Sequence, residues 1–213
     1  IRESDLSLEN MSPLKRYYAL NTEVLRQRGG TPLRIDIKGA EHLVTEHHDV
    51  MLEAATTSFQ IHLKTPISTI HRYFNASIMA SAPVLAASVN APFLFGKDLW
   101  SETRIPLFEQ AVDLKGADSG MRRVSFGSGY ANAHMLNLFE ENADCYPALL
   151  PCLFESPADK YRHVQLQNGT IWRWNRPLIG FEDNGQPHLR FETRGFPAGP
   201  SFMDMMASTA FHI

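Results

Sequence analysis

The stretch PHLRFETRG, residues 187–195, decides the fold class of this chain. Its residues up to Arg194 are predicted to form a strand, and the turn sequence Asp183-Asn184-Gly185-Gln186 comes directly before it. We predict another strand at 161–171, joined to this one through residues 172–186. The end of the chain therefore favours an antiparallel sheet.

The rest of the chain alternates irregularly between helix and strand signals. Strands are predicted at 33–37 and 56–63, with a polar connection at 41–49 and a glycine-rich loop at 116–129. Helices are predicted from Ser12 to Gly29, over 66–90 with a kink or break at Pro83, in a short segment capped by Ser101, over 134–142, and after a cap at Ser201. Strands scattered among helices in this way predict an α+β fold with a mainly antiparallel sheet.

Composition narrows the possible functions. The chain has 213 residues, which suits one domain or part of one, and a formal net charge of -3 gives no general basic field for nucleic acid. No apolar run approaches the roughly 20 residues needed to cross a membrane. The two cysteines, Cys145 and Cys152, favour free thiols in a reducing compartment, so we expect a cytoplasmic protein.

Two short strand segments carry polar residues at alternate positions. Alternate residues of a strand point to the same face, so Glu192 lies beside Arg194, and Gln60 lies beside His62. A carboxylate can hold magnesium while a guanidinium binds a phosphate oxygen, and an amide with an imidazole can bind a cation or a substrate. Surface ion pairs or a solvated sheet face would produce the same spacing, so both alternatives stay open.

Three further segments are weaker candidates. Trp172 to Arg176 interleaves tryptophans with arginines, which suits anions or flat rings but also a packed tryptophan pair. Arg104 is suited either to a substrate carboxylate or to a helix surface. The histidines and acids of residues 42–49 do not follow a zinc-ligand spacing.

In order along the chain, these segments resemble the glutamate–cysteine ligase family in its bacterial and plant-type branches. The similarity runs from about Asp49 to the end, and its most specific tract is 172–200. It comprises MLEAATTSFQIHL at 51–63, SVNAPF at 88–93 followed by Gly96-Lys97, an arginine at 104, the tract from Trp172 to Pro177, and ETRG at 192–195 followed by Gly199-Pro200.

The resemblance implies a curved, mainly antiparallel sheet with flanking helices, as in the catalytic fold of glutamine synthetase. It implies that ATP phosphorylates the γ-carboxylate of L-glutamate and that L-cysteine, or another amine, then attacks the acyl phosphate. The implied metal ligands for magnesium are Glu192 and His62. The implied substrate or ATP-binding residues are Gln60, Arg104, Trp172, Trp174, Arg176 and Arg194, and of these Arg194 and Arg176 would also neutralise charge at the transferring phosphoryl group.

One departure from the family pattern qualifies this interpretation. The family opens with a strand that carries a Glu-x-Glu pair, and residues 1–30 are predicted to be helical instead. We therefore expect residues 1–213 to be a single, partial ligase domain that lacks this acidic strand and the C-terminal helices. The alternative is a degenerate ligase-like domain that binds a nucleotide, an amino acid or a protein partner without catalysis.

Overall fold

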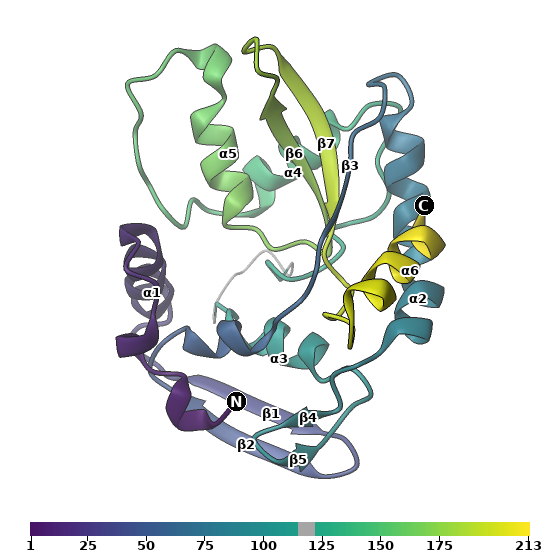
Figure 1. Ribbon diagram of the computed structural model, residues 1–213. Coiled ribbons are helices and arrows are strands. Elements are labelled where there is room, and N and C mark those ends of the chain that lie inside the picture. Colours follow the sequence, from purple (N-terminus) through teal and green to yellow (C-terminus); the bar gives the residue numbers. More distant parts are fainter. Residues whose placement is uncertain (115–121) are drawn as a thin grey trace.

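The computed structural model describes residues 1–114 and 122–213 (Figure 1). The part of the predicted loop at 116–129 that precedes residue 122 lies outside this range. The helices are α1 (Lys15–Gln27), α2 (Ile70–Ser88), α3 (Arg104–Ala111), α4 (Leu136–Cys145), α5 (Arg162–Gly169) and α6 (Phe202–His212). Short 3-10 turns are η1 (Glu3–Asp5), η2 (Leu8–Asn10), η3 (Met51–Ala55) and η4 (Ala158–Lys160).

The strands form small antiparallel sheets. One sheet pairs β1 (Leu33–Lys38) with β2 (His42–His47), and another pairs β4 (Phe93–Leu94) with β5 (Lys97–Asp98). A third has the order β3-β7-β6, from β3 (Ile61–Leu63), β7 (Pro187–Thr193) and β6 (Asn175–Phe181). The predicted α+β class with antiparallel pairing is confirmed, although its strands are divided among separate sheets.

The three-stranded sheet is the scaffold of the site. Helix α5 lies on one side of the β6–β7 hairpin, while α2 and α6 lie on the other (Figure 1). Phe191 of β7 is fully buried and packs edge to face against Phe74 of α2, with ring centroids 5.6 Å apart. Burial of these aromatic rings fixes one face of β7 against α2 and leaves its other face for polar residues.

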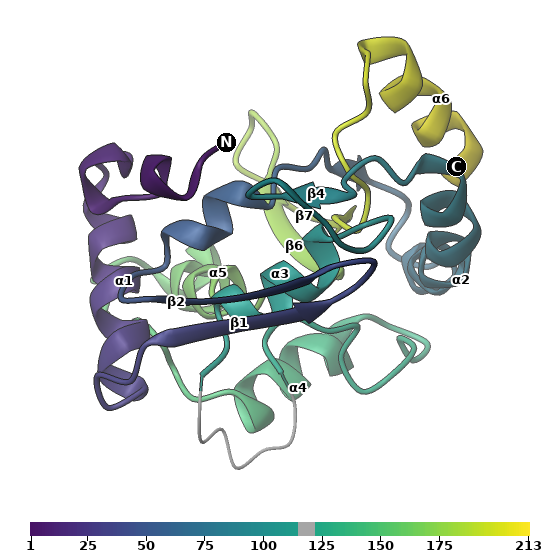
Figure 2. The same ribbon diagram turned by 90° about the horizontal axis from the view of Figure 1, so that it is seen from below.

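A separate layer underlies this scaffold. In the view from below, the β1–β2 hairpin runs across α3 (Figure 2). Alternate residues of β1 are buried, and Ile35 and Ile37 pack with Leu52 of η3 and Leu107 of α3. This cluster holds η3 in place immediately before β3, which carries part of the site.

Several predicted elements are confirmed. Helix α1 ends before Gly29 and Gly30, both of which have positive φ, as expected for a glycine stop. Strand β1 coincides with the predicted alternating segment. At the start of α6 the Ser201 side chain accepts a hydrogen bond from the backbone amide of Asp204, which is the predicted cap.

The strand predicted at 161–171 is wrong, because this segment contains helix α5. In the helical conformation Gln165 donates to the carbonyl of Ile179 over 3.0 Å, and Asn168 donates to the carbonyl of Pro177 over 2.7 Å. These bonds attach α5 to β6, which is itself part of the predicted connection at 172–186. Tertiary hydrogen bonds therefore outweigh the local β-strand signal.

The polar connection predicted at 41–49 is also wrong. Strand β2 occupies most of it, because every residue from His42 to His47 finds a backbone partner on β1. The strand predicted at 56–63 is shorter than expected. Only Ile61–Leu63 pair as a strand, and Ser58 forms a single bridge to Pro197.

Two local predictions about helices need correction. Pro83 does not divide α2, which continues from Ile70 to Ser88. Pro83 and Met79, whose carbonyl loses its helical partner, are both exposed, so water can satisfy that carbonyl. The N-cap position of α3 is Thr103 rather than Ser101, and its side chain makes no capping hydrogen bond to the helix.

Among the described residues, no helix is both long and apolar enough to cross a bilayer.

Candidate functional site

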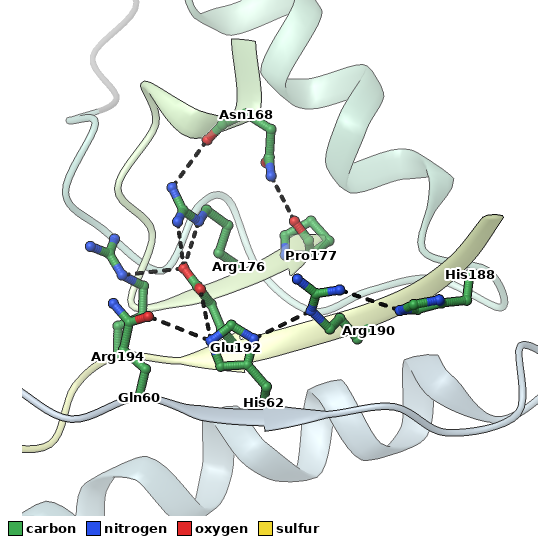
Figure 3. A network of polar contacts seen from close by, with 9 residues as sticks. All are labelled: Gln60, His62, Asn168, Arg176, Pro177, His188, Arg190, Glu192 and Arg194. Carbon is green, nitrogen blue, oxygen red and sulfur yellow. Dashed lines mark hydrogen bonds and ion pairs between the residues drawn. The ribbon is translucent and has the colours of Figure 1, made fainter. Parts of the chain in front are cut away.

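A row of three polar residues crosses the three-stranded sheet. His62 of β3 is the register partner of Glu192 of β7, and Glu192 is also the register partner of Arg176 of β6. Directly paired residues of neighbouring strands point to the same face, so the three side chains meet above the sheet. Gln60 and Arg194 lie alongside this row (Figure 3).

Glu192 is the centre of this constellation and is 2% exposed. Its Oε1 accepts a hydrogen bond from Arg176 Nε at 2.7 Å and lies 2.6 Å from Arg176 Nη2. Arg194 Nε is 3.3 Å from the same oxygen, while Oε2 is 3.3 Å from His62 Nε2. One buried carboxylate is therefore the counterion of two guanidinium groups, and the constellation keeps an excess of positive charge.

Arg194 has unused hydrogen-bond donors. Its Nη1 is buried without a hydrogen-bond partner among the described residues, and its Nε lies 3.3 Å from Glu192 Oε1 without forming a hydrogen bond. Burial and, after it, the positive charge of Arg176 lower the pKa of Arg194 to about 10, although Glu192 and Glu53 oppose these effects. Buried N–H groups without partners are costly, so an anionic ligand would stabilise this side chain.

The tautomer of His62 follows from its neighbours. Arg190 Nε donates to His62 Nδ1 over 3.3 Å, and a guanidinium can only donate. The neutral ring therefore carries its hydrogen on Nε2, which faces Glu192 Oε2 and lies 3.5 Å from Gln60 Oε1. Burial lowers the pKa of His62, with smaller contributions from the nearby arginines and opposition from Glu192, so the neutral form is favoured.

A cavity of about 690 Å³ opens beside this constellation. Gln60, Trp172, Arg176 and Arg194, all predicted from the sequence to bind substrate or ATP, line its wall. A volume of this size suits a small-molecule ligand. The structure therefore brings these predicted residues together around one concave surface.

Trp174 and Arg104 lie elsewhere. Trp174 packs against Phe108 with ring centroids 5.7 Å apart and lines a different cavity, of about 700 Å³. Arg104 is buried, pairs with Glu102 at 3.1 Å and donates to the carbonyl of Gly195 over 2.7 Å. In this structure Arg104 supports the end of β7 and does not line the cavity beside Arg194.

Arg173, which lies between the two tryptophans in the sequence, is held by buried contacts away from the cavity beside Arg194. It is fully buried, and its Nη2 donates to Glu141 and Asn142, both over 2.7 Å. The histidines of residues 42–49 are dispersed along β2, where His42 pairs with Asp36 at 2.8 Å and His47 with Glu3 at 3.1 Å. Neither segment contributes to the cavity beside Arg194.

The predicted magnesium ligands do not form a metal site by themselves in this arrangement. Within residues 1–114 and 122–213 no group of three or more His, Cys, Asp and Glu side chains is placed to hold a metal ion. Glu192 Oε1 already contacts two guanidinium groups, and His62 presents a hydrogen, not a lone pair, toward Glu192. The donor set fits an anion better than a divalent cation, and the metal roles of Glu192 and His62 stay a prediction.

Sequence reasoning missed Arg190, Glu53 and Arg16. Arg190 and Glu192 are two apart on β7, so the period-two pattern that selected Arg194 would also have found Arg190. Glu53 and Arg16 line the cavity from η3 and α1. Nothing in the local sequence relates them to β7, because only the tertiary fold brings these elements together.

The opposite face of the sheet holds a buried polar network. His212 Nε2 lies 2.9 Å from Ser77 Oγ and 3.2 Å from Thr193 Oγ1, and Asn175 Nδ2 donates to Ser77 over 2.7 Å. These contacts join α6 to α2 and to the strand that carries Glu192. Burial lowers the pKa of His212, so the neutral ring is the form that fits this network.

The stability of the protein is expected to fall as the pH is lowered below about 6.5, the pKa of an unfolded histidine. His212 has a lowered pKa in the native state, so in this range the unfolded chain binds a proton that the native protein does not. Its contribution is fully present above about pH 6.5 and is lost toward the lower native pKa. Urea denaturation between about pH 5 and about pH 7.5 measures the effect.

The matched variant is His212→Gln, which keeps a hydrogen-bonding side chain without a titrating ring. His62 has a shift of the same sign, so the informative quantity is the difference between wild type and variant. A variant that loses stability with falling pH as steeply as wild type would exclude His212 as a source of the effect.

No family model, curated protein or solved structure matches this chain.

Proposed function

We propose that this chain is the catalytic part of an ATP-dependent carboxylate–amine ligase with a glutamine-synthetase-like fold. The reaction that fits the resemblance best is that of glutamate–cysteine ligase, which forms γ-glutamylcysteine in glutathione biosynthesis. Its substrates would be L-glutamate, ATP and L-cysteine, or another amine in place of cysteine.

One observation carries this proposal. Residues selected from distant parts of the sequence, namely Gln60, Trp172, Arg176 and Arg194, line one cavity next to buried Glu192. Arg194 presents buried donors without partners, and the constellation around Glu192 keeps excess positive charge. These properties suit phosphate and carboxylate groups, which all the substrates of such a ligase carry.

The proposed reaction needs positioning and charge neutralisation more than a protein nucleophile. A γ-carboxylate oxygen of glutamate bonds to the γ-phosphorus of ATP while the bond to the departing ADP oxygen breaks. Arg194 and Arg176 would stabilise the negative charge of the phosphoryl oxygens. The amine nitrogen then bonds to the acyl carbon, phosphate leaves with the electrons of its C–O bond, and the amine loses a proton.

The remaining residues would shape the site. Glu192 orients both arginines through its contacts with their guanidinium groups. Trp172 is 7% exposed and would provide an apolar wall, while Gln60 offers an amide to a polar ligand atom. ATP carries magnesium in such reactions, and no step above depends on a protein-bound metal.

The test is ADP release by the full-length protein with ATP, magnesium and L-glutamate, with and without L-cysteine. Release should require both glutamate and an amine, and a panel of amines then identifies the acceptor. Arg176→Met is expected to lower the rate by about 100-fold or more. Exposed Arg26→Met, which removes a surface pair with Glu23, serves as the control and should leave the rate unchanged.

Glutamate-independent ADP release, or equal rates for both variants, would count against the ligase proposal. A second candidate is a ligase-like domain that binds a nucleotide, an amino acid or a protein partner without catalysis. The lack of a three-residue metal group among the described side chains favours it. Calorimetry with Mg-ATP separates the two, because binding without turnover supports the second candidate and no binding excludes the first.

A further inference from the structure

Glu53 is the acidic residue that lines the cavity beside Arg194. It belongs to the turn η3, which comes before β3 in sequence and is held by burial of Leu52 and Met51. The charges of Glu53 and Arg194 act on each other, since each opposes the effect of burial on the pKa of the other. The cavity wall therefore contains a carboxylate close to the guanidinium groups.

The two carboxylates near Arg194 have different surroundings. Glu192 is paired with Arg176, Arg194 and His62. The carboxylate of Glu53 has no ion pair and accepts no hydrogen bond from any residue in the described part of the chain. The Glu53 side chain is exposed to the cavity, and the protein around it raises its pKa against the opposing charge of Arg194.

The charged groups of the cavity wall are Arg16, Arg176, Arg194 and Glu53. A simple dianion such as inorganic phosphate would use the guanidinium groups and be repelled by Glu53. A ligand with an anionic and a cationic group matches both signs, and an α-amino acid is the smallest common ligand of that kind. The carboxylate of Glu53 can accept hydrogen bonds from an ammonium group, which can only donate them.

We propose that Glu53 binds the α-ammonium group of an amino-acid substrate whose side-chain carboxylate lies at Arg194 and Arg176. This inference rests on the proposed function in taking L-glutamate as that substrate. It makes Glu53 a specificity-determining residue, which selects amino acids over simple dicarboxylic acids. A site built to bind one polar group of its substrate discriminates against analogues that lack that group.

The test compares L-glutamate with glutarate, which has both carboxylates and no ammonium group. Calorimetry on the full-length protein should show that L-glutamate binds at least about tenfold more tightly than glutarate. Glu53→Gln should remove this preference because it weakens the binding of L-glutamate. The affinity for glutarate should stay unchanged or increase, because a repelling charge is lost. Glu53→Asp, which keeps the charge, should restore part of the preference.

Glu140→Gln is the matched control, because Glu140 is an exposed acid of α4 outside the cavity wall. Circular dichroism and urea denaturation establish that each variant is folded. The inference is overturned if neither ligand binds, if wild type does not prefer L-glutamate, or if Glu53→Gln weakens both ligands equally.

Failure of this inference can be distinguished from failure of the ligase proposal, because one is measured by ligand binding and the other by ADP release. A protein that binds L-glutamate through Glu53 but releases no ADP would support the inference and contradict the catalytic proposal. A protein that releases ADP with glutamate, but binds glutamate equally well after Glu53→Gln, would support the catalytic proposal and contradict the inference about Glu53.

Discussion

Replacing Glu192 by alanine is expected to destabilise the protein by about 3–5 kcal/mol, as the loss of one partner from a buried ion pair usually does. The change leaves the mostly buried guanidinium groups of Arg176 and Arg194 next to each other without the carboxylate that both contact. Their mutual repulsion, already one cause of the lowered pKa of Arg194, would then have no compensation. Urea denaturation at neutral pH measures the free energy of unfolding.

Two comparisons separate charge from packing. Glu23→Ala removes a carboxylate that pairs at 2.6 Å with the exposed side chain of Arg26, and its expected cost is about 1 kcal/mol. The double variant Glu192→Ala/Arg176→Met removes one of the repelling charges and should regain part of the lost stability. A Glu192→Ala effect no larger than that of Glu23→Ala would mean that Glu192 is not the counterion of the site.

Replacing Phe191 by alanine is expected to cost about 3–5 kcal/mol for a different reason. Phe191 is the neighbour of Glu192 on β7 but points to the opposite face, where it is fully buried against Phe74. Truncation removes an edge-to-face contact and leaves a cavity between β7 and α2, among the residues that also include Ile70 and Met135. The same denaturation experiment measures the change.

The control for this prediction is Phe202→Ala on α6. Phe202 is 69% exposed, so its truncation removes little buried area and should change stability by no more than about 0.5 kcal/mol. Because β7 carries Glu192 and Arg194, Phe191→Ala should also weaken ligand binding in the cavity, whereas Phe202→Ala should not. Equal effects of the two substitutions on stability would show that the β7–α2 contact contributes little.

Elements with strong local signals were predictable from the sequence. Helix α1 has an amphipathic pattern and a double-glycine end, and β1 alternates buried and exposed residues. Helix α5 was not predictable, since its short sequence has apolar residues at alternate positions that also suit a strand. Its hydrogen bonds to the carbonyls of Pro177 and Ile179, residues of β6, stabilise the helical form.

The arrangement of the candidate site was also only partly predictable from the sequence. Period-two spacing was enough to place Glu192 beside Arg194 and Gln60 beside His62, because alternate side chains of one strand share a face. It did not separate Trp172, which lines the cavity beside Arg194, from Trp174, which packs against Phe108 and lines the other cavity. That difference depends on neighbours contributed by distant helices.

By itself, the sequence determined the α+β class, the strand that carries Glu192 and the residue types of the polar strand faces. Only the tertiary structure placed His62, Glu192 and Arg176 in one row, because strand register fixes which residues of different strands meet. The tertiary structure also brought Glu53 and Arg194 into the wall of one cavity. Contacts between segments far apart in sequence depend on how helices and strands pack, and local propensity carries no information about that packing.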